Sequence, residues 1–267
     1  MDMDLKTLRN ETNLPFGVLK KIISENKKSK SKNVERLFRK YMGEFADKFS
    51  QRETRYKTYG YFCQFGSYAV VEILSETNTK ELTELLSRFA KDLAQKLVST
   101  GSLPNLDKYF IELKCMFGEN IKLGNVAIER GAFTTNIRGA YQLNGNKLCI
   151  VTVSSDSGTT ELSYLKMIAK LVAKNAIFYY GEYKSLQNKR VCFRDFLYGK
   201  PLLFCDDYAN FSYNMRKNVT IKDHLYNCAI RMASQSNQEI YNRKIDKFSN
   251  YKAKNIVIED ITFLGFD

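Results

Sequence analysis

The sequence predicts an α+β protein in which a helical module precedes two related subdomains, each a β-hairpin followed by a helix. Three observations support this fold class: helical periodicity near the N-terminus, a hairpin-and-helix pattern that occurs twice in the centre, and an alternating segment at the C-terminus. With 267 residues and an apolar fraction of 44%, the chain can fill a hydrophobic core.

Residues 1–45 have the pattern of a small helical module. Apolar side chains recur at helical spacing, and Pro15 suits the first turn of a helix. They are Leu5, Leu8, Phe16, Leu19, Ile22, Ile23, Val34, Leu37, Phe38 and Tyr41. So short a segment buries little surface alone, so we expect it to dock on the chain or to act as a tethered recognition piece. Residues 43–55 are rich in charge and predict a linker.

The central part of the chain carries a weak internal repeat. Each copy has two short apolar strands around a glycine turn, at Gly66 or Gly145, and then an amphipathic helix. The segments are 59–65, 68–74 and a helix from Leu82 in the first copy, and 137–143, 147–153 and a helix from Leu162 in the second. Each helix is expected to cover one face of its hairpin.

Three further segments have patterns of secondary structure, and the whole chain is expected to have four parts. Residues 126–128 predict a strand leading into the second hairpin, 221–233 a helix, and 255–266 a closing strand. We expect a helical module at 1–45, a first core subdomain at 56–117, a second at 118–182, and a C-terminal extension that completes the core at 183–267.

Cysteine usage and hydropathy favour a reducing compartment. The six cysteines are scattered without a C-x-x-C pair, and most lie in apolar segments, which is typical of reduced core thiols. The chain shows no apolar stretch of membrane-spanning length and no secretory signal. We expect a cytoplasmic protein, with an organelle matrix as the alternative, and no contact with a membrane.

The chemistry of the sequence favours binding over catalysis. It has no phosphate-binding glycine loop, and its only histidine, His224, lies outside any nucleophile motif. The neighbouring acids Asp206-Asp207 and Glu259-Asp260 suit solvated turns or edges better than a metal site. We therefore expect no enzyme activity, no cofactor, no metal and no small-molecule substrate.

Several short motifs, in the correct order, resemble elongation factor Ts, the nucleotide-exchange factor of translation elongation. The opening Leu8 to Pro15 with Lys20-Lys21 is similar to the family's L-R-x-x-T-G and C-K-K-A-L stretches, although Asn13 replaces the glycine and Leu19 the cysteine. The central landmarks are Gly118-Glu119-Asn120-Ile121, Val126-Ala127, Tyr141, and Lys166-Met167-Ile168-Ala169 with Val172-Ala173. Tyr68 to Ile73 with Glu76-Thr77, Gly199 to Leu202, and Ile261 to Leu264 extend the likeness over nearly the whole chain.

This resemblance implies that the helical module at residues 1–45 is similar to a ubiquitin-associated domain. It also implies a partner, elongation factor Tu, whose GDP release the chain would promote during translation. The positions implied to contact that GTPase are Leu8, Arg9, Thr12, Lys20, Thr77, Asn78, Thr79 and Leu171. Thr77-Asn78-Thr79 matches the family's T-D-F motif and keeps only the threonine, and Leu171 stands where the family has a histidine. Asn78 and Thr79 also suit the N-cap of the helix that follows.

A second interpretation rests on charge. The net charge of +13 favours polyanions, so a basic RNA-associated or ribosome-associated protein with reduced exchange activity is the alternative. The basic residues show no single dominant stripe in the sequence, and the Lys-rich segment 27–32 is expected to be an exposed loop.

Overall fold

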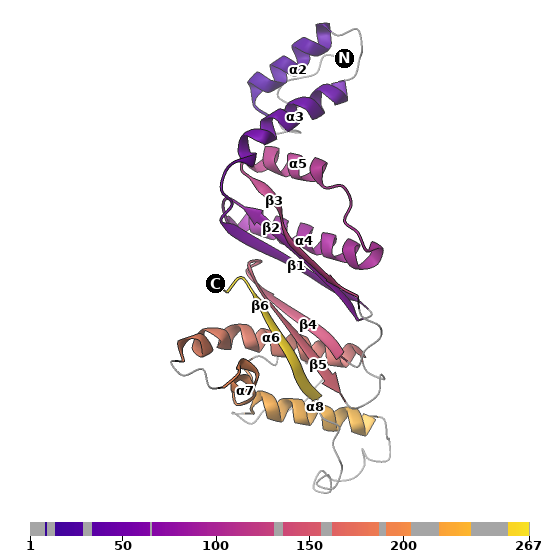
Figure 1. Cartoon of the computed structure of the whole chain (residues 1–267), viewed down its shortest axis with the longest axis vertical. Coiled ribbons are helices and arrows are strands. Elements are labelled where there is room, and N and C mark those ends of the chain that lie inside the picture. The colour runs from indigo at the N-terminus through magenta and orange to yellow at the C-terminus, as the bar shows by residue number, and fades with distance from the viewer. Residues whose placement is uncertain are drawn as a thin grey trace. The chain divides into compact units, whose positions relative to one another are not determined.

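The structure, a computed structural model, describes residues 9, 14–28, 34–64, 66–130, 136–155, 162–186, 191–203, 219–235 and 256–266. Over these residues the predicted α+β class is confirmed: helices accompany two three-stranded sheets (Figure 1). The chain divides into two compact units. Unit 1 comprises residues 1–62 and 69–128, and unit 2 comprises residues 63–68 and 129–267.

Two helices near the N-terminus, α2 (Phe16–Lys28) and α3 (Val34–Ser50), pack together in unit 1. The carbonyl of Pro15 accepts hydrogen bonds from the Val18 and Leu19 amides of α2, and Leu19 and Ile22 are buried against α3. The Tyr41 hydroxyl of α3 donates a hydrogen bond to the Glu25 carboxylate of α2. This bond joins the two helices at the edge of their apolar contact.

The linker predicted for residues 43–55 is wrong over its first part, because α3 continues to Ser50. Ala46 and Phe49 lie on the buried side of the helix, whereas charged neighbours such as Asp47 and Lys48 are exposed. A high density of charge on one helical face therefore resembled a linker. The expected docking does occur within unit 1, since Ile111 and Cys115 pack against the α2–α3 pair.

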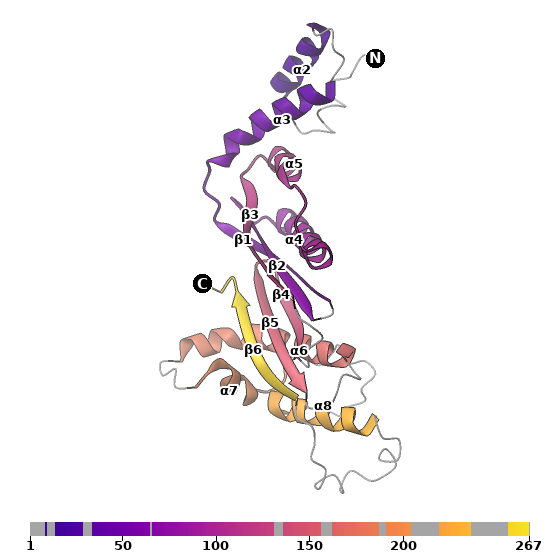
Figure 2. The same ribbon diagram turned by 45° about the vertical axis from the view of Figure 1, so that its right-hand side comes forward.

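The sheet of unit 1 has the strand order β1-β2-β3. Its strands are β1 (Tyr56–Gln64), β2 (Ser67–Ser75) and β3 (Ile121–Glu129), and its helices are α4 (Lys80–Thr100) and α5 (Asp107–Phe117). Figure 2 shows α4 along one face of this sheet. The core between them contains Ala69, Val71 and Ile73 of β2 and the predicted leucine face of α4. The first hairpin-and-helix copy is thus as the sequence predicted.

The strand β3 belongs to the first sheet, and this corrects the expected start of the second subdomain at residue 118. Ile121 and Leu123 pack into the same core as α4, so the boundary between the units falls after Ile128. The sequence of this strand does not indicate with which of the two hairpins the strand pairs.

Unit 2 repeats the arrangement and extends it. Its elements are β4 (Asn136–Leu143), β5 (Lys147–Ser155), α6 (Leu162–Ser185), α7 (Phe193–Tyr198), α8 (Ile221–Gln235) and β6 (Ile256–Leu264). The sheet has the order β4-β5-β6, with both pairs antiparallel and a register shift at Thr152/Val153. The strand β6 lies within the segment predicted to close the fold, and α8 overlaps the predicted 221–233 helix.

The two hairpins contact their helices in the same way. Gly60 of β1 touches the backbone of Ala90 in α4, and Gly139 of β4 touches the backbone of α6 beside Ala169. A Cβ atom would lie 2.1 Å from the Ala90 carbonyl carbon in the first case and 2.3 Å from the Lys170 nitrogen in the second. In both copies, the glycine and the alanine are the same number of residues apart, as expected for a repeated unit.

Candidate partner-binding site

The loop Thr77–Asn78–Thr79 connects β2 to α4 and presents three exposed polar residues. The Ser75 hydroxyl, at the end of β2, donates a hydrogen bond to the Thr77 carbonyl over 2.8 Å. The next helix begins at Lys80. The loop therefore offers its side chains at the first turn of α4, where unpaired helix amides favour negative charge or acceptor groups.

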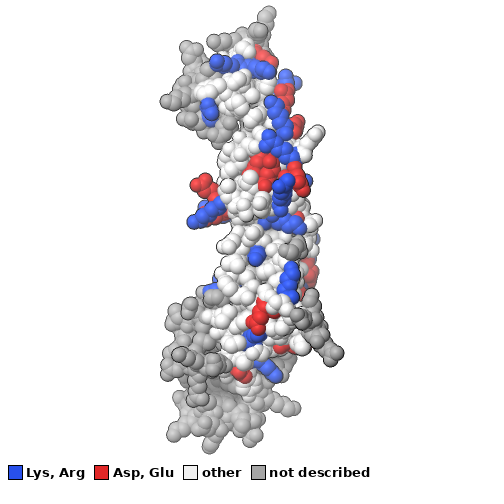
Figure 3. Space-filling model, turned by 90° about the vertical axis from the view of Figure 1, so that its left-hand side faces the viewer, with Lys and Arg blue, Asp and Glu red and all other residues white. Residues whose placement is uncertain are grey.

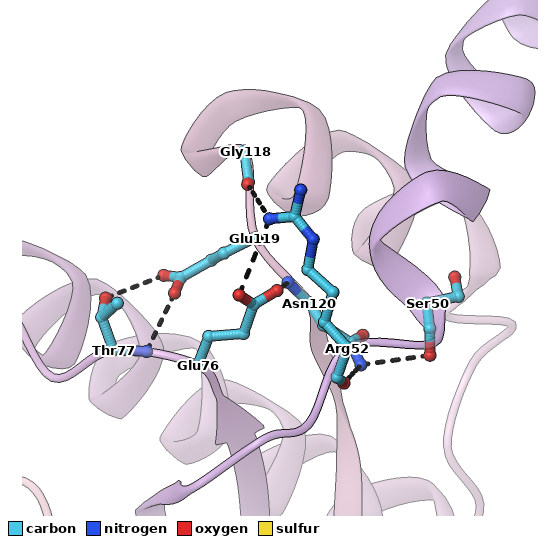
Figure 4. Close-up of polar contacts among 7 residues, drawn as sticks. All are labelled: Ser50, Arg52, Glu76, Thr77, Gly118, Glu119 and Asn120. Atoms are coloured by element: carbon cyan, nitrogen blue, oxygen red, sulfur yellow. Dashed lines mark hydrogen bonds and ion pairs between the residues drawn. The ribbon is translucent and has the colours of Figure 1, made fainter.

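The buried carboxylate of Glu119 holds the start of this loop. One carboxylate oxygen accepts the Thr77 amide at 2.9 Å, and the other accepts the Thr77 hydroxyl at 3.2 Å (Figure 4). Burial raises the pKa of the Glu119 carboxyl above its ordinary value, and repulsion from Glu76 adds to the rise, whereas the two bonds from Thr77 oppose it. Glu119 thus fixes both the backbone and the side chain of Thr77.

A second carboxylate, Glu76, connects the loop to β3. Its carboxylate accepts a hydrogen bond from the backbone amide of Asn120 and lies 3.7 Å from the Arg52 guanidinium. Arg52 also donates to the Gly118 carbonyl at 3.4 Å and stacks on Phe49. The Arg52 guanidinium therefore offsets part of the repulsion between the carboxylates of Glu76 and Glu119.

Asn120 links this network to the end of α3. Its side-chain amide donates to the Ser50 carbonyl at 3.2 Å and to the Arg52 carbonyl at 2.7 Å (Figure 4). The side chain is 1% exposed, and its oxygen has no hydrogen-bond partner among the described residues. Two donated bonds thus set the orientation of the amide, and they tie the segment after α3 to the β2–α4 loop.

Two of the predicted contact residues are exposed on or near the helical module. The Arg9 guanidinium lies 4.5 Å from the ring centroid of Phe16, which is itself exposed, and Lys20 is exposed on α2. Leu8 and Thr12 lie outside the described residues. The cation–π contact places Arg9 against the first turn of α2.

The structure corrects the expectation for Leu171, which was predicted to contact the partner. It is 1% exposed in α6, and its carbonyl accepts a hydrogen bond from the buried Asn175 side chain. α6 is buried over a wide arc that includes Leu171 as well as the stripe from Leu165 to Ala173. In this structure, Leu171 is an interior residue and offers no surface to a partner.

Thr79 occupies the predicted N-cap position of α4, but its side chain does not cap the helix. Thr79 occupies the N-cap with extended backbone angles, and its carbonyl accepts the Thr83 amide at 2.9 Å. Its hydroxyl makes no capping hydrogen bond. The Thr79 side chain therefore has no capping role that would compete with binding a partner.

Glu119, Asn120 and Arg52 had no predicted role, although Gly118-Glu119-Asn120 belongs to the landmarks of the resemblance. A signal was present: two polar residues stand between a helix-ending glycine and an apolar strand. Gly118 closes α5 in the left-handed conformation, with a φ of 68°, and the polar pair follows at once. Polar side chains at such a junction have backbone groups nearby to bind.

Other reactive groups of the described chain do not gather into a site. His224 lies 3.4 Å from the Cys228 sulfur, one turn away on α8, and Cys228 is buried. Glu259 and Asp260 are exposed on β6 and accept hydrogen bonds from Ser154 and Thr262. Within the described residues, no three potential metal ligands cluster. Asp206 and Asp207 fall outside those residues.

Comparison with known proteins does not identify a family for this chain. Models of known protein families give no match to the chain, and a search of curated proteins finds no significant match. None of the described helices has the length and apolar character needed to cross a bilayer.

Proposed function

We propose that this chain promotes guanine-nucleotide exchange on elongation factor Tu by binding the GTPase, with no covalent step. The observation that carries the proposal is a hydrogen-bond link between the loop that the resemblance to elongation factor Ts implies to contact the GTPase and the helix α3, which packs on α2. The exposed loop Thr77–Asn78–Thr79 and the end of α3 are joined through Glu119, Glu76 and Asn120. Such a network would present the loop and the helical module to one partner together.

The mechanism requires only differential binding. A protein that binds the nucleotide-free GTPase more tightly than the GDP-bound form weakens GDP binding by the same factor, because the coupling free energy is reciprocal. The loop has Asn78 and Thr79 in place of the family's aspartate and phenylalanine, so it lacks an apolar anchor worth about 2 kcal/mol in a packed interface. Its contribution would come from hydrogen bonds of Asn78, Thr79 and the helix amides.

Electrostatics support rapid association with an acidic partner surface. The chain has a net charge of +13, which raises the encounter rate with negatively charged proteins. On the face drawn in Figure 3, Lys and Arg are interspersed with Asp and Glu among the described residues. Arg9 would add directional hydrogen bonding, since its guanidinium stacks on Phe16 and can still donate from its edges.

The test is the release of a fluorescent GDP analogue from elongation factor Tu of the same source. We expect wild-type protein to accelerate release, and simultaneous Thr77→Ala, Asn78→Ala and Thr79→Ala substitution to reduce the acceleration at least tenfold. The matched control removes three exposed polar side chains at the other end of α4 by Gln95→Ala, Ser99→Ala and Thr100→Ala. Control and wild type should be equal.

The proposal fails if folded wild-type protein neither binds the GTPase nor speeds release. The charge of +13 and the changed T-D-F motif would then favour the basic RNA-associated or ribosome-associated protein. Co-sedimentation with ribosomes that weakens with salt and does not need the GTPase would support that alternative.

A further inference from the structure

Two exposed apolar side chains belong to segments that border the loop Thr77–Asn78–Thr79. Tyr56, the first residue of β1, is 39% exposed, and Met116, in the last turn of α5, is 50% exposed. These two residues, Tyr56 and Met116, are called the flanking pair below. Single exposed apolar side chains are normal on a protein surface, so their position relative to the loop decides whether they have a function.

Tyr56 stands where β1 runs beside the end of β2. The preceding residue, Arg55, donates its backbone amide to the Ser75 carbonyl at 2.9 Å, and the Ser75 hydroxyl bonds the Thr77 carbonyl. Since side chains alternate along a strand, Tyr56 is on the same face of the sheet as Gly60, which touches α4. Tyr56 therefore lies on the helix-covered face, at the end of the sheet where the chain leaves β2 for the loop and α4.

Met116 faces away from the two cores on which its helix packs. Its neighbours along the chain belong to these cores: Cys115 packs with the α2–α3 pair, and Phe117 packs with the sheet and α4. Successive side chains are about 100° apart around a helix, so Met116 takes a third direction, toward solvent. Three residues further on, Glu119 accepts both hydrogen bonds from Thr77 (Figure 4). The end of α5 thus lies beside the loop.

The loop itself cannot supply the apolar part of a protein interface. Its three side chains are polar, and hydrogen bonds formed on binding replace hydrogen bonds to water, so their net contribution is small. Most interface energy comes from a few side chains packed away from water, and tyrosine and methionine are enriched among interface residues. A tyrosine and a methionine beside the polar loop therefore match the composition of a binding surface.

We infer that Tyr56 and Met116 contact the GTPase beside the loop and provide the apolar anchors of that interface. The inference rests on the exchange function proposed above. β1 and β3 lie on opposite sides of β2, and the flanking pair comes from β1 and from the helix that leads into β3. One partner surface that covers the loop therefore reaches both side chains. A second copy of the chain fits less well, because stable dimer interfaces are larger and more apolar than two side chains divided by polar residues.

The test measures the affinity of the full chain for nucleotide-free elongation factor Tu at low and high salt. Tyr56→Thr and Met116→Gln should each weaken binding about fivefold to tenfold, as expected for the loss of an apolar anchor. The factor should not depend on salt, because no charge is removed. The apolar replacements Tyr56→Phe and Met116→Leu should bind as wild type. Both side chains are exposed, so the midpoint of chemical unfolding should be unchanged in all of these variants.

The matched control changes two apolar side chains of unit 2, Tyr226 and Leu203, which are 50% and 51% exposed. Tyr226→Gln and Leu203→Gln should bind as wild type. Wild-type affinity in Tyr56→Thr and Met116→Gln, or equal weakening by the control variants, would overturn the inference and leave the exchange function standing. A wild-type dimer that the flanking-pair variants disrupt, with GTPase affinity unchanged, would assign the pair to a second copy of the chain. Absence of binding by the wild-type chain would remove the exchange function, and the inference with it.

Discussion

At the scale of single residues, the candidate site depends on two buried polar side chains between α5 and β3. Glu119 binds both hydrogen-bond donors of Thr77, and Asn120 binds two carbonyls at the end of α3. Neither side chain is among the residues implied to touch a partner. Their effect on binding would be indirect, through the position of the loop.

Removing the Glu119 carboxylate should therefore affect exchange more than stability. Thr77 is exposed, so water can replace the lost acceptors, and Glu119→Ala should cost about 1 kcal/mol of unfolding free energy. The loop would lose its fixed geometry, so GDP release should slow several-fold. Glu53→Ala serves as the control, because Glu53 forms an exposed ion pair with Arg55 that should contribute little. An unchanged release rate for Glu119→Ala would show that the loop needs no such support.

The raised pKa of Glu119 predicts a pH dependence of stability. The folded state holds this proton more tightly than the unfolded state, so the unfolding free energy falls as pH rises from about 4.5 toward the raised pKa. Glu119→Gln cannot ionise and lacks this contribution. Denaturant titrations should show Glu119→Gln gaining on wild type across that window, and a constant difference would contradict the assignment.

Thiol reactivity should follow burial. Cys192 is exposed, whereas Cys115 and Cys149 are buried; burial raises the pKa of Cys115 to about 11 and that of Cys149 well above its ordinary value. Because the thiolate is the reactive form, a maleimide should modify Cys192 first among these three. Mass-spectrometric mapping of the labelled protein tests this, with Cys192→Ser as the control. Early labelling of Cys149 would contradict the packing of unit 2.

Resemblance drew attention to Glu119 and Asn120, but their partners could not be predicted from the sequence. Thr77 is 42 positions from Glu119, and Ser50 is 70 positions from Asn120. Side-chain hydrogen bonds over such separations depend on how strands and helices pack, which local patterns do not encode. For Leu171 the resemblance was misleading, because it implied a partner contact at a position that is buried.

At the scale of elements, local patterns predicted most of the fold. The two glycine turns and the apolar faces of α4 and α6 were evident because hairpins and amphipathic helices are encoded within a few residues. The continuation of α3 to Ser50 was missed because charged residues on its exposed side masked the buried positions Ala46 and Phe49. Periodicity decides such segments better than overall composition.

The closest contacts between helix and sheet give a prediction at this scale. Gly60→Ala and Gly139→Ala would each force a methyl group into helix backbone, so each should destabilise the protein by about 1–3 kcal/mol. Gly43→Ala in α3 meets no atom within 4 Å and should instead stabilise it by about 0.5–1 kcal/mol. Chemical denaturation of the three variants checks both signs. Wild-type stability in Gly60→Ala and Gly139→Ala would disprove the shared packing.

At the scale of the whole molecule, the order of the two hairpin-and-helix copies was predictable, whereas the helices α5 and α7 and the sheet to which β3 belongs were not. The strand β3 pairs into the first sheet, and its sequence alone does not distinguish that pairing from one with the second hairpin. Function belongs to this scale as well, because the proposed exchange activity needs the loop and the helical module to act on one GTPase.

The most direct measurement of the central claim is the affinity of the chain for elongation factor Tu in two states, nucleotide-free and saturated with magnesium and GDP. Exchange by differential binding predicts tighter binding to the nucleotide-free state, by the same factor by which the chain weakens GDP affinity. A ligand with equal affinity for both states shifts no equilibrium, however tightly it binds. Equal dissociation constants for the two states would therefore contradict the account, whereas a reciprocal difference of tenfold or more would establish it.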